Sequence, residues 1–234
     1  KLAGRPVTAD DLRKSIAVYN ENRRAIDALY SYRAQKPWQA PTAEVYLVLR
    51  AGLVLPVEEH TKLVREYIAA ADASPRAKRD NARVVLTGAF CEQPPLGLIK
   101  SIEMAGCYIV DDDFMLCFRW LIGDVPLEGD PLVNLSGAFL HRSAATASKY
   151  DAKKEDKGRP LVQSVKHYGA EGVIFAAPSF CDPALLERPM LQGVLAKHKI
   201  PYTAFKYAEN TGQMAPIREQ AGTFADSIKL WSAA

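Results

Sequence analysis

Four short apolar runs that alternate with helical patterns constrain the fold of this chain most strongly. The runs are rich in Val, Ile, Phe and Ala, and their length is that of strands rather than helices. They span residues 83–89, 107–111, 172–177 and 200–205. Strands joined by helical crossovers run parallel, and a parallel sheet is covered on both faces. The sequence therefore predicts an α/β fold with a four-stranded parallel sheet and helices on both faces.

The helices of this α/β part are predicted from apolar spacing and from prolines near their starts. They span about residues 94–105, 131–150, 160–168, 183–198 and 213–230, and a further helical stretch of uncertain limits reaches Trp120. Strand and helix thus alternate along the chain from about residue 82 to its end.

Residues 1–80 follow a different, wholly helical pattern. Thr8-Ala-Asp-Asp has the form of a capping box, and apolar residues then recur at helical spacing to about residue 32. Further helices are predicted to start near Thr42 and to span about residues 56–73. These helices hold too few apolar positions to close a core of their own. We therefore expect residues 1–80 to form a helical arm that packs on an α/β domain of residues 81–234.

Composition and charge narrow the class of protein. The 234 residues are 48% hydrophobic and 24% charged, close to an average globular chain. A net charge of +3, from 30 basic and 27 acidic side chains, gives no case for a nucleic-acid partner. No apolar run is long enough to span a membrane, so we expect a soluble protein. The absence of a CxxC pair and of an export signal favours the reducing cytoplasm, and the start at Lys1 instead of methionine indicates processing or a fragment.

Ligands of open parallel sheets bind outside the carboxyl ends of the strands, so the loops after the strands are the candidate sites. Cys91 and Cys181 stand in two of these loops, each within a few residues of a predicted helix start, and Cys181 lies between Pro178 and Pro183. A helix N-terminus favours the thiolate form, which metals and electrophiles require. The alternative is that each cysteine is a small buried hydrophobe. Cys107 and Cys117 are predicted to be core residues.

The acidic run Asp111–Asp113 follows the second predicted strand. It could bind a divalent ion or act as general acid or base, but a helix N-cap with a solvated neighbour is the preferred interpretation. Glu209, Asn210 and Gln213 follow the fourth strand and could bind substrate or form a turn. The four histidines lie in predicted helices, away from these loops.

Three common motifs are absent from the sequence. It contains no GxGxxG after the first strand, no GxxxxGK[ST] and no GxSxG. The dinucleotide fingerprint, the phosphate-binding loop of ATPases and the nucleophile elbow of α/β hydrolases are thereby excluded.

Four long motifs carry a family resemblance. They are LTGAFCEQPP (86–95), GCYIVDDD (106–113), FAAPSFCDPAL (175–185) and KYAENTGQ (206–213), the last followed by IREQAG (217–222). Together they resemble the benzoyl-CoA reductase / 2-hydroxyacyl-CoA dehydratase family, and within it the smaller C- or gamma-type subunit of the ATP-dependent reductases. The resemblance covers essentially the whole chain.

The resemblance implies a fold, a cofactor and partners. Such subunits have two flavodoxin-like domains and bind a [4Fe–4S] cluster between them through three cysteines. A homologous cluster-binding subunit pairs with them, an ATP-hydrolysing pair injects electrons that a ferredoxin supplies upstream, and an aromatic acyl-CoA is reduced by two electrons to a cyclic diene. This chain matches one α/β domain and a helical arm, so we expect the N-terminal domain of the family to be absent from it.

The resemblance also implies site residues. Cys181 is the ligand carried over to this domain, and Cys91 is a weaker candidate. We expect no stable cluster in the isolated fragment, and the catalytic residues stay unassigned. The candidate substrate contacts are Glu92, Gln93, Ser179, Phe180, Glu209 and Asn210.

Three other functions stay open. The first is a 2-hydroxyacyl-CoA dehydratase subunit, which uses the same fold and cluster to remove water; the Cys-Glu-Gln-Pro-Pro loop favours the reductase. The second is a non-catalytic assembly domain, in which Cys181 would be buried in apolar packing. The third is an ordinary flavodoxin-like domain that binds flavin or nucleotide.

Overall fold

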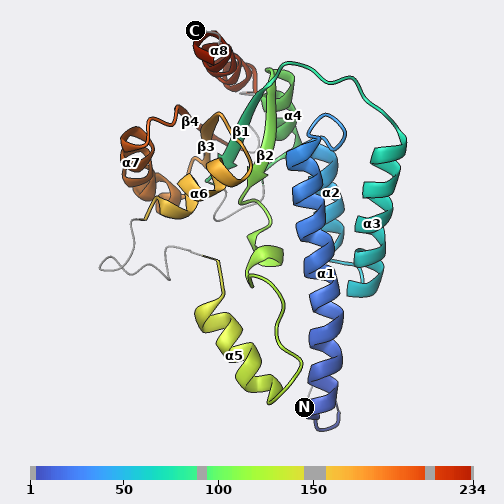
Figure 1. The fold of residues 1–234 in the computed structure, drawn as a ribbon. Helices are drawn as coiled ribbons and strands as arrows, with labels where there is room; N and C mark the ends of the chain where they lie inside the picture. The colour runs from blue at the N-terminus through green and yellow to red at the C-terminus, as the bar shows by residue number, and fades with distance from the viewer. Residues whose placement is uncertain (1–3, 89–93, 145–156, 209–213, 233–234) are drawn as a thin grey trace.

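The computed structural model describes residues 4–88, 94–144, 157–208 and 214–232, and its centre is a four-stranded parallel sheet (Figure 1). The strands are β1 (Ala82–Thr87), β2 (Cys107–Asp112), β3 (Gly172–Pro178) and β4 (Tyr202–Tyr207), in the order β2-β1-β3-β4. All three strand pairs are parallel. This order is that of flavodoxin-like sheets. The predicted fold class is therefore confirmed.

Helices cover both faces of the sheet. Neighbouring residues of a strand point to opposite faces, so one strand contributes side chains to a core on each side. Val84 and Leu86 of β1 face one core, to which α4 (Leu96–Met104) and α8 (Met214–Ser232) contribute. Val85 faces a second core, closed by α6 (Arg159–His167) and α7 (Asp182–Lys197). β3 is buried along its whole length. Such continuous burial explains why its sequence is an uninterrupted apolar run.

The N-terminal helices are α1 (Ala9–Gln35), α2 (Thr42–Ala51) and α3 (Val57–Ala73). Figure 1 shows α1 beside β2, with α2 and α3 next to it. Several of their buried side chains, among them Leu29 and Tyr46, belong to the same core as the buried residues of α4 and α8. The division into an arm and a domain at residue 80 stays a prediction.

Thr8 caps α1 as the sequence predicts. The Thr8 hydroxyl accepts a hydrogen bond from the Asp11 amide at 3.2 Å, and the Asp11 carboxylate accepts one from the Thr8 amide at 2.9 Å. This capping box is confirmed. No helix in the described ranges is both long and apolar enough to cross a membrane.

Several element limits differ from the predicted ones. β4 begins at Tyr202 and not at residue 200, because Pro201 has no amide hydrogen to donate to the ladder. α5 (Pro131–His141) is shorter than predicted: Ser143 forms an isolated antiparallel bridge with Leu121, and the rest of the predicted helix lies outside the described residues. The stretch before Trp120 is a single 3-10 helix, η1 (Leu116–Arg119).

Cys117 lies in η1 and is exposed, so the prediction that it is a core residue is wrong. The preceding residues Phe114 and Met115 are buried and fill that part of the core instead. Cys107, at the start of β2, is fully buried, and burial raises the pKa of its thiol to about 12. Its predicted core role is confirmed.

A buried histidine makes the stability of the helical region depend on pH. The Asn22 amide donates to His60 Nδ1 at 3.0 Å, so His60 Nε2 carries the proton and donates to the Val48 carbonyl at 3.1 Å. Burial lowers the pKa of His60 below its ordinary 6.5. The folded state therefore holds the neutral ring at a pH where the unfolded chain already takes up a proton.

We expect the free energy of unfolding to fall as the pH drops from above the ordinary pKa of 6.5 toward the lowered pKa of folded His60. Urea unfolding at about pH 7.5 and about pH 5.5 measures this loss. His60→Gln should be less stable at the higher pH and should lose less on acidification. The exposed His141→Gln is the control and should keep the wild-type pH dependence. Equal losses in wild type and His60→Gln would contradict the assignment.

Candidate functional site

The candidate site lies where the carboxyl ends of β1 and β3 meet. These two strands are neighbours, with Thr87 paired to Phe175. The chain leaves β1 toward β2 on one side and leaves β3 toward β4 on the other, so the connections diverge at this point. A divergence of this kind is the usual ligand position in open α/β sheets.

A tight turn after β3 places Cys181. The Cys181 amide donates to the Pro178 carbonyl at 3.0 Å, and the Cys181 carbonyl accepts from the Leu185 amide at 3.0 Å in the first turn of α7. Ser179 fixes the turn to β4, because its amide and its hydroxyl both donate to the Tyr207 carbonyl, at 2.8 and 3.0 Å. Cys181 thereby becomes the N-cap of α7.

The environment of Cys181 is apolar on one side and faces a helix N-terminus on the other. Its exposed fraction is 1%, and it belongs to a small cluster with Ala177, Ala184 and Leu185. Phe180, the residue before it, is 94% exposed. The Cys181 sulfur is thus shielded from solvent at the N-terminal end of α7.

Position 88, directly after β1, favours glycine for two reasons, its backbone conformation and a close contact with β3. Gly88 has a φ of +118°, and a Cβ built there would lie 2.9 Å from the Ala176 carbonyl oxygen of β3. Asp113 holds this end of the strand: its Oδ2 accepts from the Thr87 hydroxyl at 2.7 Å and from the Gly88 amide at 3.1 Å. β1 and β3 therefore end in close backbone contact.

The acidic run is not a solvated helix N-cap, and that prediction is wrong. Asp111 and Asp112 are the last residues of β2, each is only 6% exposed, and the next helix starts only at Leu116. Arg33 of α1 pairs with Asp112 at 2.6 Å, and Arg119 pairs with Asp111 at 2.8 Å. Strand residues this deeply buried need positive partners instead of water.

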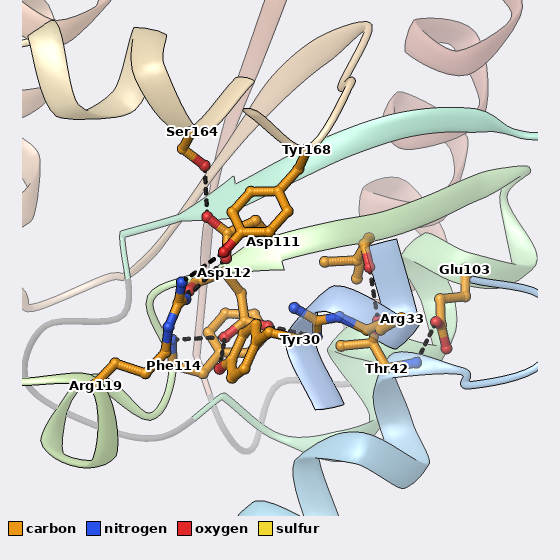
Figure 2. A network of polar contacts seen from close by, with 11 residues as sticks. Tyr30, Arg33, Thr42, Glu103, Asp111, Asp112, Phe114, Arg119, Ser164 and Tyr168 are labelled. Atoms are coloured by element: carbon orange, nitrogen blue, oxygen red, sulfur yellow. Dashed lines mark hydrogen bonds and ion pairs between the residues drawn. The ribbon is translucent and has the colours of Figure 1, made fainter. Parts of the chain in front are cut away.

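Figure 2 shows how this network joins four parts of the chain. Asp112 also accepts from the Tyr30 hydroxyl and from the Phe114 amide, both at 3.1 Å.

The two arginines make further contacts. Arg119 donates to the Tyr168 hydroxyl at 3.1 Å. Both guanidinium groups lie over the Tyr30 ring, 4.6 Å (Arg33) and 4.0 Å (Arg119) from its centroid. The Ser164 hydroxyl of α6 donates to Asp111. Burial raises the pKa of Tyr30, so its hydroxyl stays protonated.

These contacts decide against the metal alternative for the acidic run. Arginines and hydroxyl groups already engage the Asp111 and Asp112 carboxylates, and no group of three or more His, Cys, Asp or Glu in the described part of the chain is placed to hold a metal ion. Sequence reasoning missed Arg33 and Arg119. The signal was the apolar surroundings of the acidic residues, since carboxylates inside a buried strand require buried cations.

The structure brings part of the predicted site together. Ser179, Phe180 and Cys181 form one turn at the carboxyl edge. The Ser179 hydroxyl hydrogen is already given to the Tyr207 carbonyl, which leaves only its lone pairs for a ligand. The other predicted residues lie outside the described ranges: Cys91, Glu92, Gln93, Glu209, Asn210 and Gln213.

The described residues fit a share of an iron–sulfur site. Cys181 offers a soft sulfur ligand, shielded from solvent at 1% exposure, at the N-cap of α7. The carboxylates nearby do not fit, because cations or hydroxyl groups hold them. Of the described cysteines, Cys181 alone lies at this edge. A cluster bound here would need its other thiolate ligands from cysteines outside the described residues.

Sequence comparisons relate the chain to subunits of acyl-CoA reductases and dehydratases. The chain is 63% identical over 231 residues to a benzoyl-CoA reductase subunit of Thauera aromatica, its C-type one, in an alignment that covers 99% of this chain and 60% of that protein. It is 26% identical over 230 residues to the beta subunit of (R)-2-hydroxyglutaryl-CoA dehydratase of Acidaminococcus fermentans, covering 97% and 60%. A third relative, the beta subunit of (R)-phenyllactyl-CoA dehydratase of Clostridium sporogenes, is also 26% identical, over 228 residues covering 97% and 60%. The chain thus spans 60% of the length of these relatives.

The family model for the 2-hydroxyglutaryl-CoA dehydratase D-component matches residues 1–228. This match includes the helical region as well as all four strands. The resemblance predicted from the loop motifs is confirmed. The chain belongs to the 2-hydroxyglutaryl-CoA dehydratase, D-component family.

Proposed function

We propose that this chain is part of a subunit of an ATP-dependent benzoyl-CoA reductase, which reduces an aromatic acyl-CoA by two electrons to a cyclic diene. The observation that carries the proposal is the contrast in identity. The chain is 63% identical to the reductase relative, against 26% for each of the two dehydratase beta subunits, in alignments that each cover nearly the whole chain. The buried Cys181 turn at the sheet edge supports the same proposal.

The proposed cofactor is a [4Fe–4S] cluster, which supplies low-potential electrons one at a time when bound. Cys181 is its proposed ligand from this domain, and Cys91 is a second candidate. The surrounding residues have defined tasks. Ser179 fixes the ligand turn to β4, the start of α7 fixes the backbone of Cys181, and the apolar cluster around Cys181 excludes water.

Substrate contacts and partners are part of the proposal. Phe180 is 94% exposed beside Cys181, so its ring can contact an aromatic thioester or a partner surface. Glu92, Gln93, Glu209 and Asn210 are the proposed polar contacts. The proposed partners are a homologous cluster-binding subunit, an ATP-hydrolysing pair and a ferredoxin, all in the cytoplasm.

The two kinds of enzyme differ in the reaction that the assembled complex performs. We expect the full-length subunit, assembled anaerobically with its partners and supplied with ATP and reductant, to convert benzoyl-CoA to a diene. The same preparation should not dehydrate 2-hydroxyglutaryl-CoA or phenyllactyl-CoA. Product analysis with each thioester measures this. Dehydration without reduction would replace the proposal with the dehydratase alternative.

A non-catalytic assembly role is the second candidate, because α5 presents an apolar surface. Only Pro131 and Ala138 of this helix are buried, and it packs against α1. Four large apolar side chains of α5 are more than half exposed: Leu132, Val133, Phe139 and Leu140. Exposed apolar surface of this kind marks contact with another protein. The low exposure of Cys181 agrees with this role as well.

A further inference from the structure

The three carboxylates of the acidic run hold three different parts of the chain. Asp111 bonds Arg119 and α6 on one face of the sheet, and Asp112 bonds α1 on the other. Asp113 lies one residue beyond the end of β2 and reaches across to the end of the neighbouring strand β1. Asp113 is therefore the member of the run that contacts the candidate site.

Asp113 engages the last residue of β1 and the glycine that follows it. One oxygen, Oδ2, accepts from the Thr87 hydroxyl at 2.7 Å and from the Gly88 amide at 3.1 Å. The Gly88 amide belongs to a backbone with a φ of +118°, a conformation that other residues rarely adopt. The carboxylate thus selects one backbone geometry among those that glycine can adopt.

Gly88 lies against β3, the strand that leads into the Cys181 turn. A Cβ at position 88 would lie 2.9 Å from the Ala176 carbonyl oxygen, so the two backbones are already in contact. Ala176 is two residues before Pro178, whose carbonyl accepts the Cys181 amide in the tight turn. The position of Gly88 is therefore coupled to the part of β3 that leads into the Cys181 turn.

We propose that Asp113 is a positioning residue of the site, which sets the place of the Cys181 sulfur by holding Thr87 and Gly88 against β3. This inference rests on the proposed function, because its consequence is read on the iron–sulfur cluster. Residues that orient ligands from outside the first coordination sphere change metal affinity or activity by about 10–100-fold when replaced.

The test uses the full-length subunit in its anaerobic complex. Asp113→Ala removes both hydrogen bonds, whereas Asp113→Asn keeps an acceptor oxygen for them. We expect Asp113→Ala to bind iron about 10–100-fold more weakly in competition with a chelator and to shift the EPR signal of the reduced cluster. Asp113→Asn should stay close to wild type in both measurements.

Asp130→Ala is the matched control. Its carboxylate also accepts two hydrogen bonds, from the Leu132 and Val133 amides at 2.8 and 3.0 Å, but at the start of α5. This variant should lose stability without a change in the EPR signal or in iron affinity.

The outcomes separate the two proposals. Wild-type iron affinity and EPR signal in Asp113→Ala, with a cluster present in the wild-type complex, would overturn the positioning role and leave the proposed function standing. The same changes in Asp113→Asn as in Asp113→Ala would also overturn it, because the acceptor oxygen would then be irrelevant. A wild-type complex without any cluster would refute the proposed function, and the positioning role with it.

Discussion

Replacing Arg33 by methionine is expected to lower the free energy of unfolding by about 3–5 kcal/mol, the usual effect of removing one partner of a buried ion pair. The side chains of Arg33 and Asp112 are 1% and 2% exposed, and their closest nitrogen and oxygen are 2.6 Å apart. Without the guanidinium, the Asp112 carboxylate keeps two neutral donors among the described residues, the Tyr30 hydroxyl and the Phe114 amide. Water cannot reach it to compensate.

Asp112→Asn is expected to have an effect of similar size, for the opposite reason. Arg33 would stay buried and charged, while its Nε and Nη2 have no hydrogen-bond partner in the described part of the chain. The double variant Arg33→Met with Asp112→Asn should be more stable than the sum of the two single effects predicts, because neither unpaired charge remains. Urea unfolding followed by circular dichroism measures all three variants.

The control for this pair is Lys62 and Glu66 on α3. Their side chains are 75% and 63% exposed, and the charged atoms are 3.7 Å apart. Lys62→Met should change the free energy of unfolding by less than about 0.5 kcal/mol. An Arg33→Met variant that loses no more than this control would show that the core tolerates an unpaired Asp112 carboxylate.

β1, β2 and β3 could be predicted because they are largely buried and bounded by polar residues. β3 is buried at every position, so its apolar run reports the strand directly. The capping box at Thr8 was equally visible, because its two hydrogen bonds join residues only three positions apart. Local and strongly patterned features are the ones that a single sequence reveals.

The polar network could not be predicted, because its partners are distant in the sequence. Arg33 and Asp112 are 79 positions apart, and Ser164 and Asp111 are 53 apart. A local pattern sees only an acidic run before a helical stretch, and an N-cap is then the natural interpretation. The prediction that Cys117 is a core residue failed for a related reason. The sequence does not show that Phe114 and Met115 are the residues of this stretch that face the core.

The Cys181 turn was predictable from chemistry. Two prolines, a cysteine and a following helix specify a rigid turn at a helix N-terminus, and the hydrogen bonds from Cys181 to Pro178 and from Ser179 to Tyr207 agree with it. The role of Ser179 was not predictable, because its acceptor belongs to a strand that is adjacent only in the folded sheet. Cys91 and Glu209 stay predictions, since they lie outside the described residues.

Cys181→Ser is expected to abolish most of the iron bound by the full-length subunit. A serine oxygen keeps the size of the side chain but replaces a soft ligand, which iron–sulfur clusters select, by a harder one. The loss of iron affinity should exceed the about 10–100-fold that changes outside the ligand sphere produce. Anaerobic determination of iron and sulfide, with EPR of the reduced protein, measures the effect.

Cys107→Ser is the matched control, because it makes the same substitution at a cysteine that is also fully buried. The Cys107 sulfur lies 3.9 Å from the Ala221 carbonyl, and burial raises the pKa of its thiol to about 12, so it is a neutral core side chain. Its replacement should lower stability and leave the iron content unchanged. Equal iron in Cys181→Ser and wild type would mean that the buried Cys181 thiol has the same packing role as Cys107, and the assembly function would then explain the site better than catalysis.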